Sequence, residues 1–169
     1  LHQLRFVKSP AEIEKIAMAC KITSNAFVGI AQTSSPGESE IEICRRMKID
    51  LLERGADSIP YLVAGSGPGG YGSIIMGPTE RLLSEGDVLI IDTGTTYDGY
   101  FCDFDRNLAF GRIPDDTRKA HEVIFNATDA GFSAAHPGAT TSEVWAAMWK
   151  ELEKGGALGN NVGRMGHGL

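Results

Sequence analysis

The chain has 169 residues, of which 42% are hydrophobic and 22% charged, a composition typical of one globular domain with a substantial core. The net charge of -6 argues against a nucleic-acid surface, and no apolar run reaches the roughly 20 residues that span a bilayer. The three cysteines are widely spaced and odd in number, which favours reduced thiols and a cytoplasmic location over a disulfide framework.

Capping signals predict where the first two helices begin. Ser9 and Glu12 form a capping box with Pro10 at the first helical position, and apolar residues then recur at helical spacing. A second helix is predicted to start at Ser39 and to end at Gly55. We predict two more helices at about 115–131 and 141–154, and strands near 61–64, 88–93 and 100–110. This mixture indicates an α+β protein.

A glycine-rich stretch follows the first predicted strand. Residues 65–70 read GSGPGG, which satisfies the pattern G-x-G-x-x-G of dinucleotide-binding loops. However, Pro68 interrupts the pattern, no capped helix follows it, and the stretch does not continue into the Lys-Ser or Lys-Thr pair of a P-loop. We therefore interpret this stretch as a loop that lines a pocket.

The next two predicted strands form an acidic hairpin. The apolar run 88–91 suits a buried strand and ends in Asp92, and Asp-Gly at 98–99 is a strong signal for a two-residue turn. The returning strand carries Asp103 and Asp105 on one face. With the turn at 98–99, Asp92 lies opposite Asp105 and diagonal to Asp103, whereas a turn centred one residue earlier places Asp92 opposite Asp103. Either register gathers three carboxylates.

Three carboxylates at cross-strand distances of roughly 5 to 8 Å need a positive partner if they are poorly solvated. One candidate is a proton shared between two of them. Another is Arg106, although strand parity points its side chain to the opposite face. The third is a divalent metal ion held by oxygen ligands. Alternatively, the hairpin projects into water and its aspartates are fully solvated, in which case they form no binding site.

An internal repeat organises the chain at an offset of 101 residues. Residues 36–56 match residues 137–157 at seven identical positions, among them Pro-Gly near the start and Gly-Ala at the end. The same offset aligns Gly-Ser-Gly at 65–67 with Gly-His-Gly at 166–168. We therefore predict a duplicated helix-helix-strand unit. The first copy continues into the acidic hairpin, and the sequence stops where the hairpin of the second copy would begin.

Four short motifs together resemble one family of enzymes. They are Asp92-Thr93-Gly94, Asp98-Gly99-Tyr100, Cys102-Asp103-Phe104-Asp105-Arg106 and Gly166-His167-Gly168-Leu169. This combination resembles the M24-type metallopeptidases, the family of aminopeptidase P, prolidase and methionine aminopeptidase, whose creatinase-like pita-bread fold is duplicated. Residues 5–13 are similar to the junction at which the catalytic domain of aminopeptidase P and prolidase follows a separate N-terminal domain. We therefore expect residues 1–169 to be a pita-bread catalytic domain, truncated after the second helical pair, with such a domain before it.

The resemblance implies a dinuclear metal-dependent hydrolase, most simply an Xaa-Pro aminopeptidase or dipeptidase. It implies that Asp92, Asp103 and His167 are metal ligands, that His167 takes part in catalysis, and that two glutamates beyond Leu169 complete the site. The metal ions would be Mn, Co, Zn or Fe. Two such ions can hold a bridging hydroxide and polarise a scissile carbonyl. Since the family often dimerises, we also expect a homodimer, with a peptide or small-molecule substrate and no nucleic-acid or membrane partner.

The resemblance assigns supporting roles to three neighbouring side chains. Asp105 stands where many relatives have threonine, so we expect it to hold a ligand in place or to face the substrate, without binding metal. We expect the same of Thr93 and Arg106.

The sequence departs from the family in one respect. Peptidases of this family usually place a substrate-binding histidine upstream of the Gly-Asp pair that opens the hairpin. Here residues 73–81, SIIMGPTER, precede that pair at 86–87 and contain no histidine. One alternative is therefore a metal-dependent enzyme that acts on a small amide or amidine-like metabolite. A second is a non-catalytic binding module on the same fold.

Overall fold

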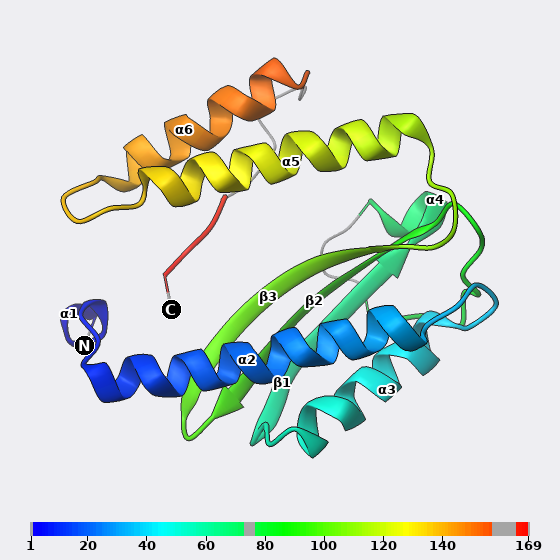
Figure 1. Ribbon diagram of the computed structural model, residues 1–169, viewed down its shortest axis with the longest axis horizontal. Helices are drawn as coiled ribbons and strands as arrows, with labels where there is room; N and C mark the ends of the chain where they lie inside the picture. The colour runs from blue at the N-terminus through cyan, green and yellow to red at the C-terminus, as the bar shows by residue number, and fades with distance from the viewer. Residues whose placement is uncertain (1, 73–76, 157–164, 169) are drawn as a thin grey trace. The chain divides into compact units, whose positions relative to one another are not determined.

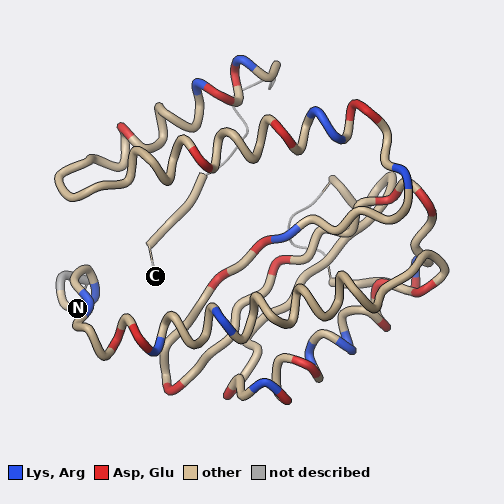
Figure 2. Tube along the Cα trace, in the orientation of Figure 1, with Lys and Arg blue, Asp and Glu red and all other residues tan. Residues whose placement is uncertain are grey.

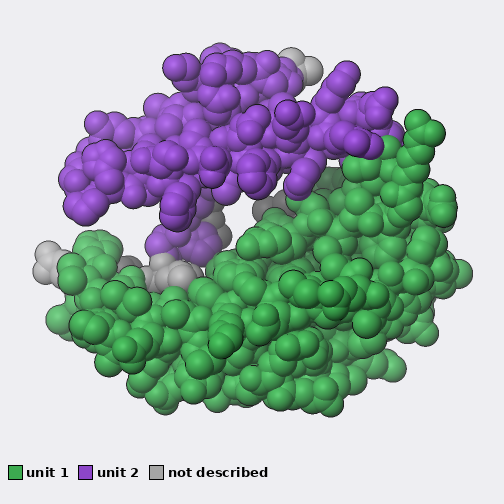
Figure 3. All heavy atoms as spheres, viewed as in Figure 1, with its two compact units in different colours: residues 1–113, 169 green, residues 114–168 purple. Residues whose placement is uncertain are grey.

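The structure is a computed structural model that describes residues 2–72, 77–156 and 165–168. These residues form two compact units, one within residues 1–113 and one within residues 114–168 (Figures 1 and 3). The first unit contains α1 (His2–Phe6), α2 (Pro10–Thr33), α3 (Glu40–Glu53), β1 (Ser58–Ser66), the short α4 (Gly67–Gly70), β2 (Val88–Tyr97) and β3 (Tyr100–Ala109). The second contains α5 (Asp115–Ala134) and α6 (Thr141–Lys154).

The first unit is an antiparallel sheet in the order β1-β2-β3, with α2 and α3 on one of its faces (Figure 1). Side chains alternate across a strand, so every second residue of the central strand points at the helices. The core of the unit forms there, from buried residues of β2 (Leu89, Ile91), α2 (Ile22, Ala26, Phe27, Ile30) and α3 (Ile43, Met47, Leu51).

Three helices begin with the capping boxes that their sequences encode. The side chains of Ser9, Ser39 and Thr140 each accept the backbone N–H of a glutamate three residues later, whose carboxylate accepts the N–H of the capping residue. The predicted starts of the first two helices are confirmed, and α6 has the predicted bounds. Within the described ranges, no helix is both long enough and apolar enough to cross a bilayer.

Helix α5 differs from its predicted range, because it continues past Gly131 to Ala134. The sequence treats this glycine as a helix terminator. In the structure Gly131 is buried, and a Cβ atom at this position would lie 2.6 Å from Cγ and Sδ of Met148 on α6. The glycine therefore permits a close approach between the two helices of this unit and does not end the first of them.

The helix bounds reproduce the internal repeat. Helices α3 and α6 differ by 101 residues at both ends, and α2 and α5 end at Thr33 and Ala134, which are also 101 residues apart. The repeat is thus a repeated helical pair. Residue 157, which closes the predicted match, lies outside the described residues.

Candidate metal centre

The β2–β3 hairpin places three aspartates on one face of the sheet. Asp92 pairs with Asp105, and Asp103 pairs with Gly94, two residues further along β2. Of the two predicted registers, the one with its turn at 98–99 is therefore confirmed. Both turn residues have positive φ, 48° and 79°, as a two-residue type I′ hairpin requires.

This face is the one opposite to α2 and α3. The residues that alternate with the aspartates, Ile91, Thr93 and Cys102, are fully buried on the helix side, whereas Asp92 and Asp103 are half-buried and Asp105 is exposed. Figure 2 shows acidic positions along the strands in addition to the mixed charges of the helices. We call the side opposite the helices the acidic face and define it by Tyr61, Val63, Ile90, Asp92, Asp103 and Asp105.

Tyr61 of β1 joins two of the aspartates. Its hydroxyl oxygen lies 3.0 Å from Oδ1 of Asp92 and 2.7 Å from Oδ1 of Asp103, so one proton serves two carboxylates from different strands. Burial, and then the hydrogen bond to Asp103, raise the pKa of Tyr61 above its usual value, so the hydroxyl keeps this proton. The two carboxylate oxygens therefore converge on one point.

Tyr61 can reach Asp103 because a glycine lies between them. Tyr61 pairs with Gly94, and Gly94 pairs with Asp103, so the three residues form one row across the sheet. A Cβ atom on Gly94 would overlap the ring of Phe101 and would lie 2.7 Å from Cε1 of Tyr61. The bare backbone thus leaves space for the tyrosine ring to lie across the central strand. The ring centroids of Tyr61 and Phe101 are 6.2 Å apart.

Of the three supporting side chains, two lie on the helix side of the sheet. Thr93 is fully buried, and its hydroxyl donates a hydrogen bond of 2.9 Å to the carbonyl oxygen of Tyr61, so it reaches the acidic face only through that backbone. Arg106 lies with its guanidinium carbon 4.9 Å from the ring centroid of Phe104 and donates to the carbonyl oxygen of Asp105. Its side chain points away from the acidic face, as strand parity predicts.

Asp105 is the third carboxylate of the acidic face. Desolvation by neighbouring protein atoms, and then the negative charge of Asp92, raise the pKa of the Asp105 carboxyl above its usual value, although the residue as a whole is exposed. Asp105 lies directly opposite Asp92, whereas Tyr61 bonds to Asp92 and Asp103. The three aspartates therefore occupy different surroundings.

The donor chemistry of this face fits a hard divalent cation, because carboxylate oxygens are the ligands that such ions prefer. The fit is partial. Within residues 2–72, 77–156 and 165–168, no group of three or more His, Cys, Asp or Glu side chains is arranged to hold a metal ion. The acidic face therefore offers two convergent carboxylates, Asp92 and Asp103, and further ligands would have to come from elsewhere.

The predicted ligand His167 belongs to the second unit. It is exposed, and its Nδ1 lies 3.1 Å from the carbonyl oxygen of Gly168. Leu169, the last residue of the motif in which His167 was identified, lies outside the described residues.

The sequence alone identified neither Tyr61 as a part of the site nor the need for a glycine at position 94. One signal was available, since Tyr61 alternates with Val63 on the strand that precedes the hairpin. Using it required the pairing of β1 with β2, in which Val63 lies opposite Asp92. That register changes between Ser58 and Tyr61, and no local pattern in the sequence fixes such an irregularity.

The described residues thus form a sheet with two helices on one face and paired aspartates on the other, followed by a second copy of the helical pair. A sequence model of metallopeptidase family M24 matches residues 14–169, and the chain belongs to this family. It is 29% identical over 170 residues to the probable dipeptidase PepE of Mycobacterium tuberculosis, covering 100% of this chain and 45% of that protein. It is 31% identical over 176 residues to the uncharacterized peptidase YqhT of Bacillus subtilis, covering 100% and 48%.

Solved structures show the same fold. Dipeptidase PepE from Mycobacterium ulcerans superposes with a TM-score of 0.87 at 29% identity, over 92% of this chain and 42% of that chain. An Xaa-Pro dipeptidase from Bacillus anthracis gives 0.86 at 26% identity, over 91% and 43%. The predicted pita-bread fold, truncated after its second helical pair, is therefore confirmed. The chain spans less than half the length of these relatives.

Proposed function

We propose that the protein containing this chain is a dinuclear metal-dependent hydrolase, most simply an Xaa-Pro dipeptidase or aminopeptidase. The observation that carries the proposal is the single Tyr61 hydroxyl within hydrogen-bonding distance of both Asp92 and Asp103. Two carboxylates that approach one point from different strands are suited to a shared cation. The relatives support hydrolysis of Xaa-Pro peptides as the reaction, since the similar proteins from Pyrococcus furiosus and Lactobacillus helveticus are named Xaa-Pro dipeptidases.

In this proposal Asp92 and Asp103 bind the metal ions, His167 is a third ligand, and two glutamates beyond this sequence complete the site. Two divalent ions in such a site supply Lewis acidity toward a scissile carbonyl. The chain itself orients the first two ligands, because Tyr61 donates its proton between them while Thr93 holds the backbone of Tyr61 from the helix side. Asp105 faces the same side and is open to solvent, so it is placed to contact a substrate.

A second candidate is hydrolysis of a small amide or amidine-like metabolite by the same metal centre. The stretch that carries a substrate-binding histidine in the family peptidases has none here. In its described part, Thr79 bonds to Glu40 and Arg81 bonds to Asp87, so these two polar side chains serve the scaffold. The identity of the metal, the homodimer and the cytoplasmic location stay predictions.

Hydrolysis of dipeptides by the whole protein tests the proposal. We expect cleavage of Xaa-Pro dipeptides in preference to matched Xaa-Ala dipeptides, loss of activity with a chelator, and recovery on adding Mn²⁺. A protein that binds metal but cleaves neither peptide would favour the metabolite alternative. A protein that binds no metal would favour the binding module and would contradict the proposal.

A further inference from the structure

The chain reverses direction directly after β1, in a tight turn at residues 67–70. This stretch carries the label α4, but Pro68 has φ -57° and ψ 126°, and Gly69 has φ 93° and ψ -29°, which are not helical. They are the angles of the two central residues of a type II turn, which favours proline first and requires a residue such as glycine second. The turn therefore follows from the Pro-Gly pair, and its rigid geometry fixes where the chain goes next.

The turn comes to lie on the acidic face. Gly65 pairs with Ile90, so a side chain at position 65 would point to the same side as Asp92. A Cβ atom placed there would lie 2.8 Å from the carbonyl oxygen of Gly70. Gly65 is also buried, whereas Val63, which lies opposite Asp92, is only half-buried. Gly70 thus lies over the sheet beside the row of Gly65 and Ile90. That row is two residues from Asp92, or about 7 Å along the strand at roughly 3.3 Å per residue.

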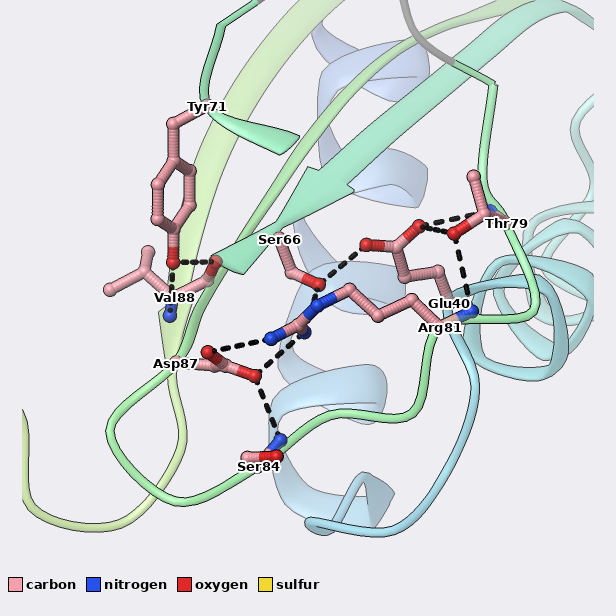
Figure 4. A network of polar contacts seen from close by, with 8 residues as sticks. All are labelled: Glu40, Ser66, Tyr71, Thr79, Arg81, Ser84, Asp87 and Val88. Carbon is pink, nitrogen blue, oxygen red and sulfur yellow. Dashed lines mark hydrogen bonds and ion pairs between the residues drawn. The ribbon is translucent and has the colours of Figure 1, made fainter. Parts of the chain in front are cut away.

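Tyr71 anchors the turn to the start of β2. Its hydroxyl donates a hydrogen bond of 2.9 Å to the carbonyl oxygen of Val88 and accepts one of 3.0 Å from the N–H of Val88 (Figure 4). Ser66, the last residue of β1, pairs with Leu89. The tyrosine hydroxyl therefore replaces the strand neighbour that β1 no longer supplies once the chain has turned away.

A polar network built around the buried residues Glu40, Ser66 and Asp87 holds the other end of the same connection (Figure 4). Arg81 donates to both carboxylate oxygens of Asp87, at 2.7 and 3.1 Å, and to the hydroxyl of Ser66 at 2.8 Å. Ser66 in turn donates to Glu40, whose side chain also accepts from Thr79. Glu40 is only 2% exposed, and these donors satisfy its carboxylate oxygens away from water.

Arg81 also supports the turn itself. A Cβ atom on Gly67, whose φ is 65°, would overlap the guanidinium group of Arg81. The first residue of the turn thus lies directly against this arginine, which is tied to the sheet through Asp87 and Ser66. Both ends of the turn are therefore fixed relative to the strand that carries Asp92.

We propose that the turn at residues 67–72 is one wall of the substrate pocket above the acidic face, and that Gly65 and Arg81 set its height. The proposal rests on the proposed function, because it names the part of the chain that limits the size of the substrate beside the metal ligands. Gly65 lets the backbone of Gly70 descend onto the sheet, and Arg81 supports Gly67 from the other side. Both act as positioning residues.

Gly65→Ala tests this wall in the whole protein. The added methyl meets a backbone oxygen, and Gly65 has no positive φ that alanine would strain, so the main response available is a displacement of the turn. Gly77→Ala is the matched control, since nothing lies within 4 Å of its added Cβ atom and its φ is likewise not in the left-handed region. We expect Gly65→Ala to change KM for an Xaa-Pro dipeptide about tenfold, with kcat and metal content retained, and Gly77→Ala to resemble wild type.

Arg81 provides an independent variant. Arg81→Met removes the bonds to Asp87 and Ser66 and should shift KM in the same sense as Gly65→Ala, whereas Arg81→Lys, which keeps the charge, should restore part of the wild-type value. If the wild type cleaves Xaa-Pro dipeptides, the proposed function stands. In that case, a Gly65→Ala variant with an unchanged KM, or one that loses its metal together with its kcat, would overturn this inference alone. A wild type that cleaves no peptide would refute the proposed function and this inference with it.

Discussion

Replacing Tyr61 by phenylalanine removes one hydroxyl group from the acidic face and leaves the ring in its place beside Phe101. The hydroxyl proton lies between carboxylate oxygens at 2.7 and 3.0 Å, so we count it as one charge-assisted hydrogen bond, worth about 1.5 to 3 kcal/mol. Without it, Asp92 and Asp103 repel one another and separate, and the metal has to bring them back together. We therefore expect the dissociation constant for Mn²⁺ to rise about 10- to 100-fold.

Calorimetric titration of the whole protein with Mn²⁺ measures this effect. Tyr100→Phe is the matched control, because it removes a hydroxyl that donates at 3.1 Å to Glu12 on α2 and contacts no aspartate of the acidic face. The control should bind Mn²⁺ as wild type does. If Tyr61→Phe also binds Mn²⁺ with wild-type affinity, the hydroxyl does not position the carboxylates and the reasoning fails.

Two further predictions concern individual carboxylates. Asp92→Asn or Asp103→Asn should lower metal content and activity together, whereas Asp105→Asn should keep its metal and lose about 10- to 100-fold in activity; loss of metal from the last variant alone would identify Asp105 as the ligand. The hydrogen bonds from Arg81 hold the pKa of Asp87 below its ordinary 3.8, so the pair stabilises the fold above that pH and ceases to do so as the pH falls further, through the lowered pKa. In urea titrations, Asp87→Asn should therefore flatten the acid dependence of the unfolding free energy below about pH 4, and an acid slope equal to that of wild type would contradict this assignment.

The features that the sequence predicts well are specified by local chemistry. The capping boxes at Ser9 and Ser39 fix helix starts because the capping side chain and its glutamate partner are three residues apart. Asp-Gly at 98–99 favours the hairpin register that the structure adopts, one of the two that the sequence left open, because both residues tolerate the positive φ that the turn needs. That register in turn places Asp92 opposite Asp105, and so most of the candidate site follows from one dipeptide.

The features that the sequence does not predict depend on contacts between distant segments. In the sequence Gly94 is only the last residue of the motif Asp92-Thr93-Gly94, and the structure shows that it leaves space for a tyrosine ring from another strand. Gly65 lies in a motif with a nucleotide-binding pattern, and only the structure shows that it accommodates the carbonyl oxygen of Gly70. Gly131 has the appearance of a helix terminator and instead contacts a neighbouring helix. In each case the missing side chain matters because of what occupies the space beside it.

Elemental analysis of the whole protein tests most directly the claim that the acidic face contributes to a metal centre. After dialysis against metal-free buffer and reloading with Mn²⁺, we predict about two divalent ions per chain for the wild type and markedly fewer for Asp103→Asn. A wild-type protein that retains no divalent metal, or an Asp103→Asn variant that retains as much as wild type, would contradict the claim.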